Sequence, residues 1–217
     1  MRQFLLTLFL LYVGLGQVDA QSTSRRAIPS VVPVKQEVDR GFLNGHSYVN
    51  AELGLEISFP EPWQIATDDV ALEMRKKGFD LDVRAPEGLS PAARTSVNRA
   101  IRSVAILVTA YQPGAVARVS RESLSGYPQI KDAVDYLDAV RLTYAAMKLP
   151  ADFKYSETQA EKLGAKQYGF LDISNRSGKK RMYATVRSGH AVLFTLSYDK
   201  QKDLEAFRAV LSGARFR

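Results

Sequence analysis

The segment from Tyr127 onward constrains the fold more than any other part of the chain, because helix and strand patterns alternate there. Residues 127–150, YPQIKDAVDYLDAVRLTYAAMKLP, carry apolar side chains at intervals of three and four, which is typical of a helix with one apolar face. Pro128 is expected in the first turn, where a missing N–H is tolerated, and Pro150 follows the end of the helix. The predicted apolar face consists of Ile130, Val134, Leu137, Val140, Tyr144 and Met147.

Three strand patterns follow this helix. The segments AKQYGFLDIS, RMYATVR and HAVLFTLSYD are separated by NRSGKK and by the two-residue turn SG. Turns of this length join antiparallel strands. The middle strand is expected to place Met182, Ala184 and Val186 on one face.

A second helix is predicted in the closing segment KQKDLEAFRAVLSGARF, with Gly213 at its end. Its apolar face consists of Leu204, Phe207, Val210 and Leu211. The order of helix, antiparallel strands and helix predicts an α+β fold, with a central antiparallel β-sheet flanked by α-helices.

The stretch Tyr48–Trp63, YVNAELGLEISFPEPW, predicts the beginning of this sheet. Gly54 supplies a turn, and an alternating half-buried strand follows it. The two prolines after this strand end its hydrogen-bond ladder because neither can donate. Trp63 is interpreted as a core residue and not as a ligand platform. The buried face of the strand consists of Leu55, Ile57 and Phe59.

The region between these two parts gives weaker signals. Residues 68–78 fit either a short strand or a helical turn, and LSPAARTSVNRA fits a helix start with Ser90 as the cap and Pro91 in the first turn. The segment Ser103–Tyr111, SVAILVTAY, is apolar on both faces. It therefore predicts a central strand that is covered on both sides and ends at a Pro-Gly turn.

The N-terminal residues resemble a secretory signal peptide. Residues 1–20 combine Arg2, an apolar run too short to span a bilayer comfortably, and the small residues Val18 and Ala20 at positions −3 and −1 of a cleavage site. Cleavage after Ala20 would leave a secreted or periplasmic protein without a transmembrane segment, whereas an uncut anchor is the alternative. Residues 21–44 are expected to be a flexible linker and residues 45–217 a single domain.

Charge and cysteine content narrow the range of functions. The chain has no cysteine, which removes disulfides, thiolate catalysis and cysteine–metal sites. Its net charge of +7 is spread out, with short clusters at Arg25–Arg26, Arg75–Lys77 and Lys179–Arg181. Such clusters suit either a solvated surface or weak contact with anionic lipid or wall polymer. No nucleic-acid-binding motif is present, so no nucleic-acid partner is expected.

Catalytic signatures are missing from the sequence. The only histidines, His46 and His190, lack the spacing of a metal site. There is no GxSxG or SxxK frame around a serine, including the small-residue loop Ser123–Gly126, and no glycine-rich phosphate loop. No catalytic, metal or cofactor-binding residue is therefore predicted. A hydrolase site assembled in space, with His190 beside a serine and a carboxylate, is the enzymatic alternative.

The remaining polar patterns have structural interpretations. The acidic row Asp132, Asp135 and Asp138 fits the solvated face of the long helix, and Asp68–Asp69 and Asp80 with Asp82 form no calcium loop. Asn175–Ser177 has the N-glycosylation pattern. Tyrosines in or beside strands are expected mainly to pack with the hydroxyl at the rim, with a ligand groove as the alternative. These are Tyr48, Tyr111, Tyr155, Tyr168, Tyr183 and Tyr198.

Three segments together resemble the PsbP-like family. YVNAELGLEISFPEPW is similar to a Y-x-N-x-x-x-G-x-x-I-x-F-P-x-x-W start, and KLGAKQYGFLDIS and RSGHAVLFTLSYDKQKDLEAFRAVLSGARF are similar to the later strands and the ending. The resemblance covers Gly45 to Phe216 and implies an antiparallel sheet between helices. Members of the family, which include extrinsic photosystem subunits and uncharacterised exported bacterial proteins, act mainly as binding or assembly modules. Val70–Ala100 has no match, and no functional residue carries over.

The sequence thus leaves three hypotheses. The first is an exported, non-enzymatic binding or accessory protein of the bacterial envelope, with an unknown protein or envelope component as its partner. The second is the hydrolase with a spatially assembled site. The third is a protein that binds an anionic envelope surface through its basic residues.

Overall fold

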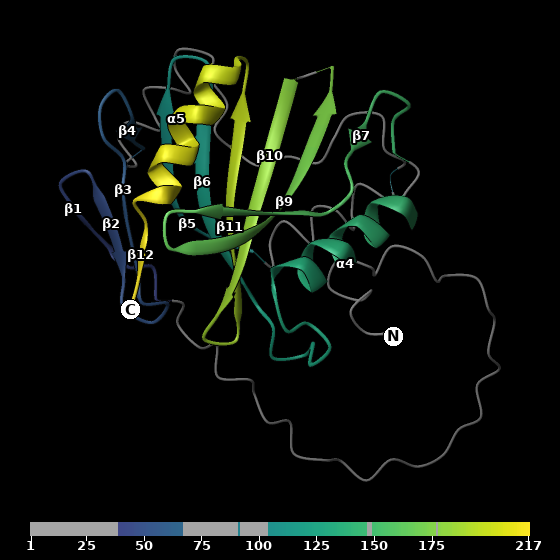
Figure 1. Cartoon of the computed structure of the whole chain (residues 1–217), viewed down its shortest axis with the longest axis horizontal. Coiled ribbons are helices and arrows are strands. Elements are labelled where there is room, and N and C mark those ends of the chain that lie inside the picture. Colours follow the sequence, from purple (N-terminus) through teal and green to yellow (C-terminus); the bar gives the residue numbers. More distant parts are fainter. Residues whose placement is uncertain (1–38, 67–90, 92–103, 147–148, 177) are drawn as a thin grey trace, which may run out of the picture.

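The computed structural model describes residues 39–66, 91, 104–146, 149–176 and 178–217. Its smaller sheet has four strands in the order β1-β2-β3-β12, all paired antiparallel (Figure 1). These strands are β1 (Phe42–Asn44), β2 (Ser47–Asn50), β3 (Leu55–Ser58) and β12 (Arg215–Phe216). The two ends of the described domain therefore meet in one small sheet.

The larger sheet has eight strands, and its pairings are also antiparallel. They are β4 (Gln64–Ile65), β5 (Ala105–Gln112), β6 (Ala115–Ser123), β7 (Lys154–Tyr155), β8 (Gln159–Leu163), β9 (Lys166–Asn175), β10 (Gly178–Arg187) and β11 (His190–Tyr198). The order across the sheet is β4-β5-β6-β11-β10-β9-β7, and β8 also pairs with β9. The predicted run of three antiparallel strands is confirmed as β9, β10 and β11.

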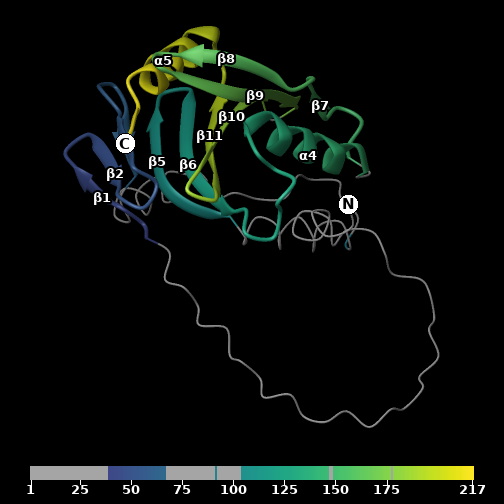
Figure 2. The same cartoon turned by 60° about the horizontal axis from the view of Figure 1, so that its bottom comes forward.

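Two helices cover opposite faces of the larger sheet (Figure 2). Successive residues of a strand point to opposite faces. On β10, Tyr183 belongs to the apolar cluster that contains residues of α5 (Gln201–Ser212), whereas Ala184 belongs to the cluster that contains residues of α4 (Ala133–Ala146). We call these the α5 face and the α4 face. The predicted α+β class with a mostly antiparallel sheet is confirmed.

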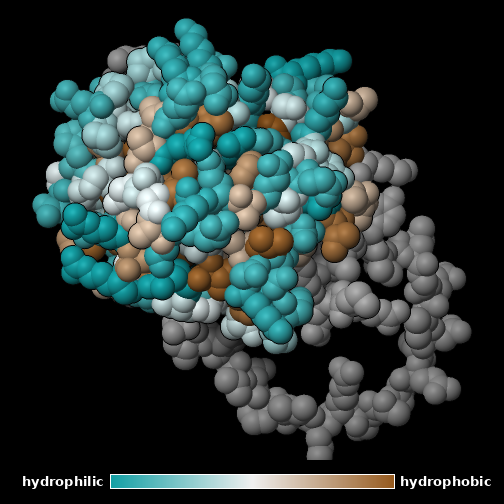
Figure 3. Space-filling view, in the orientation of Figure 1, coloured by the Kyte–Doolittle hydropathy of each residue, from teal (hydrophilic) through white to brown (hydrophobic). Residues whose placement is uncertain are grey.

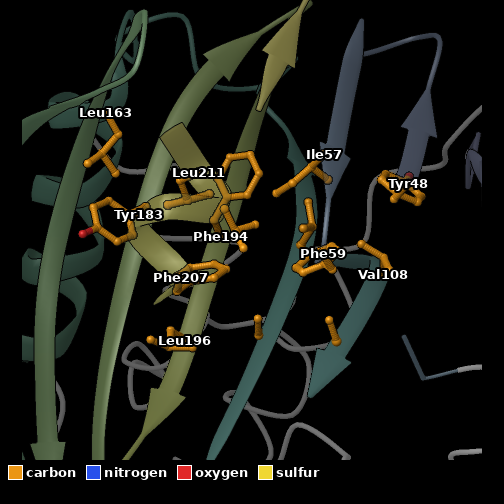
Figure 4. Close-up of a cluster of buried hydrophobic side chains, with 14 of the residues drawn as sticks. Tyr48, Ile57, Phe59, Val108, Leu163, Tyr183, Phe194, Leu196, Phe207 and Leu211 are labelled. Atoms are coloured by element: carbon orange, nitrogen blue, oxygen red, sulfur yellow. The ribbon is translucent and has the colours of Figure 1, made fainter. Parts of the chain in front are cut away.

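The α5 face carries the larger core (Figure 4). Leu55, Ile57 and Phe59 are all buried, as the alternation in the sequence predicts. Trp63 is 2% exposed, and its ring lies 6.2 Å from that of Phe59 and 6.1 Å from that of Phe207 on α5. Trp63 is therefore a core residue that joins the end of the smaller sheet to α5. The predicted apolar face of α5 is confirmed, because Leu204, Phe207, Val210 and Leu211 are buried.

The strand at Ser103–Tyr111 differs from its prediction. It forms β5, which lies beside the edge strand β4 and is buried only at Val108 and Ala110. Strand β6, which the sequence pattern did not reveal, lies further inside the sheet, between β5 and β11. β6 has a weak apolar face of alanines and a valine, and it carries Arg121 and Glu122, which are buried through tertiary partners.

Helix α4 begins later than predicted. It starts at Ala133, because the Asp132 carboxylate caps it by accepting hydrogen bonds from the backbone N–H groups of Val134 (2.8 Å) and Asp135 (2.9 Å). Pro128 therefore precedes the helix. Leu137 and Val140 are buried as predicted, but Val134 is 38% exposed. The sequence pattern missed two buried residues of this helix, Tyr136 and Thr143.

The described domain begins before the predicted linker boundary at residue 44. Phe42–Asn44 forms β1, and the carbonyl oxygens of Asp39 and Arg40 accept hydrogen bonds from Asn50 Nδ2 and the Tyr48 hydroxyl. The ambiguous segment 68–78 and the predicted cap Ser90 lie outside the described residues, whereas Pro91 is helical. No helix among the described residues has the length and apolar character needed to cross a bilayer.

Candidate functional site

The histidine, serine and carboxylate of the hydrolase hypothesis do lie near one another. The register of β6 and β11 places Ser123 directly opposite His190. Glu52, in the turn between β2 and β3, lies with Oε1 3.9 Å from His190 Nε2. The structure therefore brings together three residue types that a Ser-His-carboxylate site requires.

The bonding of these residues does not match such a site. His190 Nδ1 contacts the backbone carbonyl oxygen of Ser188 at 2.8 Å, and Nε2 faces Glu52, so neither nitrogen is directed to a serine hydroxyl. Glu52 Oε2 accepts a 2.6 Å hydrogen bond from the buried side chain of Arg121. Ser123 Oγ donates to Ser125 Oγ at 3.2 Å. This cluster connects the smaller sheet to the larger one.

Most other residues considered from the sequence have structural contacts or lie elsewhere. His46 is exposed, and its carbonyl oxygen accepts the N–H of Phe59. Asp135 accepts a hydrogen bond from the backbone N–H of Lys131, and Asp138 pairs with Arg141 at 3.2 Å. Within the described ranges, no group of three or more His, Asp or Glu side chains could hold a metal ion. Arg25–Arg26, Arg75–Lys77, Asp68–Asp69, Asp80 and Asp82 lie outside the described residues.

The strand tyrosines are mostly packing residues. Tyr48, Tyr168 and Tyr183 are buried, and their hydroxyls donate to the Arg40 carbonyl, the Leu211 carbonyl and Glu161. Burial raises the pKa of Tyr48 and of Tyr183 to about 12, so both remain protonated donors. The packing interpretation is confirmed for these three tyrosines, whereas Tyr155 and Tyr198 line a hollow at the end of the larger sheet.

The basic cluster Lys179–Arg181 is not one patch, because β10 alternates its side chains between the two faces. Lys180 points to the α4 face, where burial and the charge of Arg118 lower its pKa. Arg181 points to the α5 face, where its guanidinium makes two hydrogen bonds to Asp172, of 2.7 and 2.6 Å, and lies 4.4 Å from the ring centre of Phe170. Lys179 points to the same face as Arg181, is exposed, and has no carboxylate partner in the described structure.

Lys179 lines a hollow at the end of the larger sheet, where β7, β9 and β10 lie side by side (Figure 1). Its volume is about 350 Å³. The strand registers align Lys154 with Ser174, Ser174 with Lys179, and Lys179 with Tyr198. Directly paired residues share a face. These four residues therefore form one row across β7, β9, β10 and β11, and all four line the hollow, here called the lysine hollow.

A second hollow of about 550 Å³ adjoins the first, because Lys154 and Ser174 line both. It extends past Asp152 to Asn175 and Arg176 at the turn between β9 and β10. On the face of the molecule seen in Figure 3, hydrophilic side chains cover most of the surface, and apolar ones form small separate groups.

The charge in the two hollows is positive once the internal pairs are considered. Asp172 is neutralised by Arg181. The backbone N–H of Arg176 holds the pKa of Asp152 below its usual range, and the Arg176 guanidinium lies 3.7 Å from the same carboxylate. Lys154 and Lys179 are exposed, and neither has an ion-pair partner in the described part of the chain.

The lysine hollow can therefore bind an oxyanion. Two ammonium groups supply charge, and the hydroxyls of Ser174 and Tyr198 can donate hydrogen bonds to phosphate or carboxylate oxygens. Burial raises the pKa of the Tyr198 phenol, and the charge of Asp172 adds to this effect, so this hydroxyl keeps its proton. Sequence analysis missed the site because Lys154 and Lys179 become neighbours only through the pairing of β7, β9 and β10.

Comparison with known proteins gives structural matches only. No family model and no curated protein matches the chain. It is similar to the solution structure of cyanobacterial PsbP (CyanoP) from Synechocystis sp. PCC 6803, with 15% identity and a TM-score of 0.43 over 82% of this chain and 96% of that one. It is also similar to a 1.50 Å crystal structure from Bacteroides thetaiotaomicron VPI-5482, with 10% identity and a TM-score of 0.43.

The second match covers 81% of this chain and 49% of that one, so the chain spans about half the length of the Bacteroides protein. The sequence motifs resemble the PsbP-like family, and a PsbP protein is also among the solved structures that match this chain.

Proposed function

We propose that this protein is an exported, non-catalytic accessory protein of the bacterial envelope that binds an anionic component in the lysine hollow. The observation that carries the proposal is the row of Lys154, Ser174 and Lys179, in which two lysines without carboxylate partners in the described structure face one hollow. The signal-like residues 1–20, with cleavage after Ala20, support export. The PsbP-like α/β/α sandwich that the sequence motifs imply supports a binding module.

The hydrolase hypothesis has less support. Glu52 is held by Arg121 and both nitrogens of His190 face oxygen atoms other than that of Ser123. A serine activated for catalysis needs a base within hydrogen-bond reach. A Ser123→Ala variant is therefore expected to leave envelope binding unchanged, and a fluorophosphonate probe is expected to leave the wild-type protein unlabelled. Stoichiometric labelling of Ser123 would favour the hydrolase.

The proposed function is tested by retention of the mature chain on the insoluble envelope fraction of its own organism. Replacing both lysines, Lys154→Ala with Lys179→Ala, is expected to reduce retention at least tenfold, since two charge-assisted contacts contribute roughly 1.5 kcal/mol or more. Lys131→Ala is the matched control, because Lys131 is also exposed but lies at the start of α4. Equal retention of the wild type and the double variant would contradict the proposal.

A further inference from the structure

We propose that the lysine hollow and its neighbour form one binding trough for a linear polyanion, a chain with repeated phosphate or carboxylate groups. This inference rests on the proposed function and adds the class of ligand. The two hollows are continuous because they share Lys154 and Ser174. Together they extend across the strands from Tyr198 and Lys179 to Lys154, and along β9 from Ser174 to Arg176 at its turn into β10.

Three cations surround Ser174 in this trough. Lys179 lies on β10 and Lys154 on β7, on opposite sides of Ser174, and Arg176 lies two residues past Ser174 at the turn between β9 and β10. Neighbouring strands are about 4.8 Å apart, so the Cα atoms of the two lysines are about 10 Å apart. Like charges repel, so without a ligand the two ammonium groups are favoured to lie apart, where each can bind a different anionic group. A ligand with several anionic groups matches these separated cations.

Arg176, the third cation of the trough, can also bind an anionic ligand. The Arg176 side chain is 91% exposed, and its 3.7 Å contact with Asp152 is a long surface ion pair. Such pairs contribute little to stability. The Arg176 guanidinium can therefore move from Asp152 to an incoming anionic group at low cost.

The open form of the trough also favours a chain over a small molecule. Pockets for small ligands usually enclose most of the ligand surface. Here the lysines and Arg176 are exposed and the trough opens to solvent along its length, so a single phosphate would keep most of its water. A chain gains affinity by occupying several such weak positions at once.

The experiment is a titration of the mature protein with inorganic phosphate, triphosphate and polyphosphate of about 30 units, at several salt concentrations. Affinity per chain is expected to rise more than tenfold from triphosphate to the long polymer, because simultaneous contacts add. Log affinity falls as log salt concentration rises. By analogy with nucleic-acid backbones, each cation that contacts the polymer makes this negative slope steeper by about one. Lys154→Ala and Lys179→Ala should each reduce the magnitude of that slope by about one, and the double variant should reduce it by about two.

Controls separate specific binding from the general attraction of a protein with a net charge of +7. Lys131→Ala removes the same charge elsewhere and should leave the slope unchanged. The two single trough variants, their double variant and Lys131→Ala should all keep the wild-type melting temperature, because the three lysine side chains are exposed. Equal loss in Lys131→Ala and in the trough variants would overturn the inference.

Titrations with two further ligands identify the source of the anionic groups. Polyglutamate of matched length tests a carboxylate polymer, and vesicles with anionic phosphatidylglycerol test a lipid surface. Lysine-dependent binding to vesicles alone, or binding of inorganic phosphate as tight as that of the polymer, would overturn the polyanion inference while leaving the proposed function in place. Envelope retention that is unaffected by the double lysine variant would instead overturn the proposed function.

Discussion

At the residue scale, Gly54 is one of the positions where the backbone requires glycine. Its φ is +61°, and a Cβ there would overlap the carbonyl oxygen of Arg217, whose N–H donates to the Gly54 carbonyl at 2.8 Å. Gly54→Ala is therefore expected to reduce the free energy of unfolding by about 2–4 kcal/mol, from backbone strain plus the lost pairing with the end of β12. Urea denaturation of the mature chain measures this change.

Gly45 provides the matched control for this prediction. Its φ is +59°, but no atom lies within 4 Å of the site of a Cβ. Gly45→Ala should therefore show only the strain of the left-handed conformation, about 1 kcal/mol. If both variants lost the same stability, the contact between Gly54 and Arg217 would contribute nothing.

A second prediction at this scale concerns the buried carboxyl group of Glu122. Burial raises the pKa of Glu122, and the 2.7 Å hydrogen bond that it accepts from the Tyr136 hydroxyl offsets only part of this effect. The folded state therefore holds this proton more tightly than the unfolded state does. The stabilising contribution is complete below the ordinary pKa of 4.5 and is lost as pH rises through the folded value.

Glu122→Gln should remove this pH dependence, because the amide stays neutral and its oxygen can still accept from Tyr136. The melting temperature of the variant minus that of the wild type should become more positive between pH 4 and pH 8 in thermal denaturation. A difference that stays constant or falls over this range would show that Glu122 ionises without penalty in the folded protein.

At the element scale, the start of α4 depends on a single capping residue. Asp132→Ala removes the acceptor of the Val134 and Asp135 N–H groups and is expected to cost about 1 kcal/mol of unfolding free energy. Asp138→Ala on the same helix removes only a surface contact with Arg141 and should cost less than about 0.5 kcal/mol. Denaturant unfolding measures both losses. Equal losses of unfolding free energy in the two variants would contradict the assignment of Asp132 as the cap.

The elements that the sequence predicted well are those whose own residues determine burial. Helix α5 and strands β3, β9, β10 and β11 carry apolar side chains at the period of the element. β6 escaped prediction because tertiary partners compensate its polar residues: Glu52 pairs with Arg121, and Tyr136 bonds to Glu122. No local pattern contains those partners. β7 has only two residues, too few to show a period.

The candidate site was not predictable for a related reason. Three adjacent basic residues in the sequence suggested a patch, but strand alternation separates Lys180 from Lys179 and Arg181. The lysine that joins Lys179 in the hollow is Lys154, on another strand, and Ser174 aligns them only through the register of β9 with both neighbours. Charge patterns within one strand thus give no information about a row that runs across strands.

At the scale of the whole molecule, three kinds of contact hold the smaller sheet to the rest of the domain. Trp63 packs against Phe207 of α5, and β12 continues directly from α5 into the smaller sheet. Glu52 reaches across to Arg121 on β6, whose side chain is buried. Since each contact links the smaller sheet to a buried part of the larger unit, the two sheets should unfold as one cooperative unit.

Trp63 makes this cooperativity measurable, because it is the only tryptophan in the chain and lies where the smaller sheet meets α5. Urea unfolding followed by its fluorescence should coincide with unfolding followed by far-UV circular dichroism, which reports mainly on the larger sheet. Glu52→Gln weakens the contact with Arg121 and should shift both curves together by about 1 kcal/mol, since Glu52 is partly exposed. A fluorescence transition that precedes the dichroism transition, in the wild type or in the variant, would show that the smaller sheet detaches first and that the domain consists of two separately stable parts.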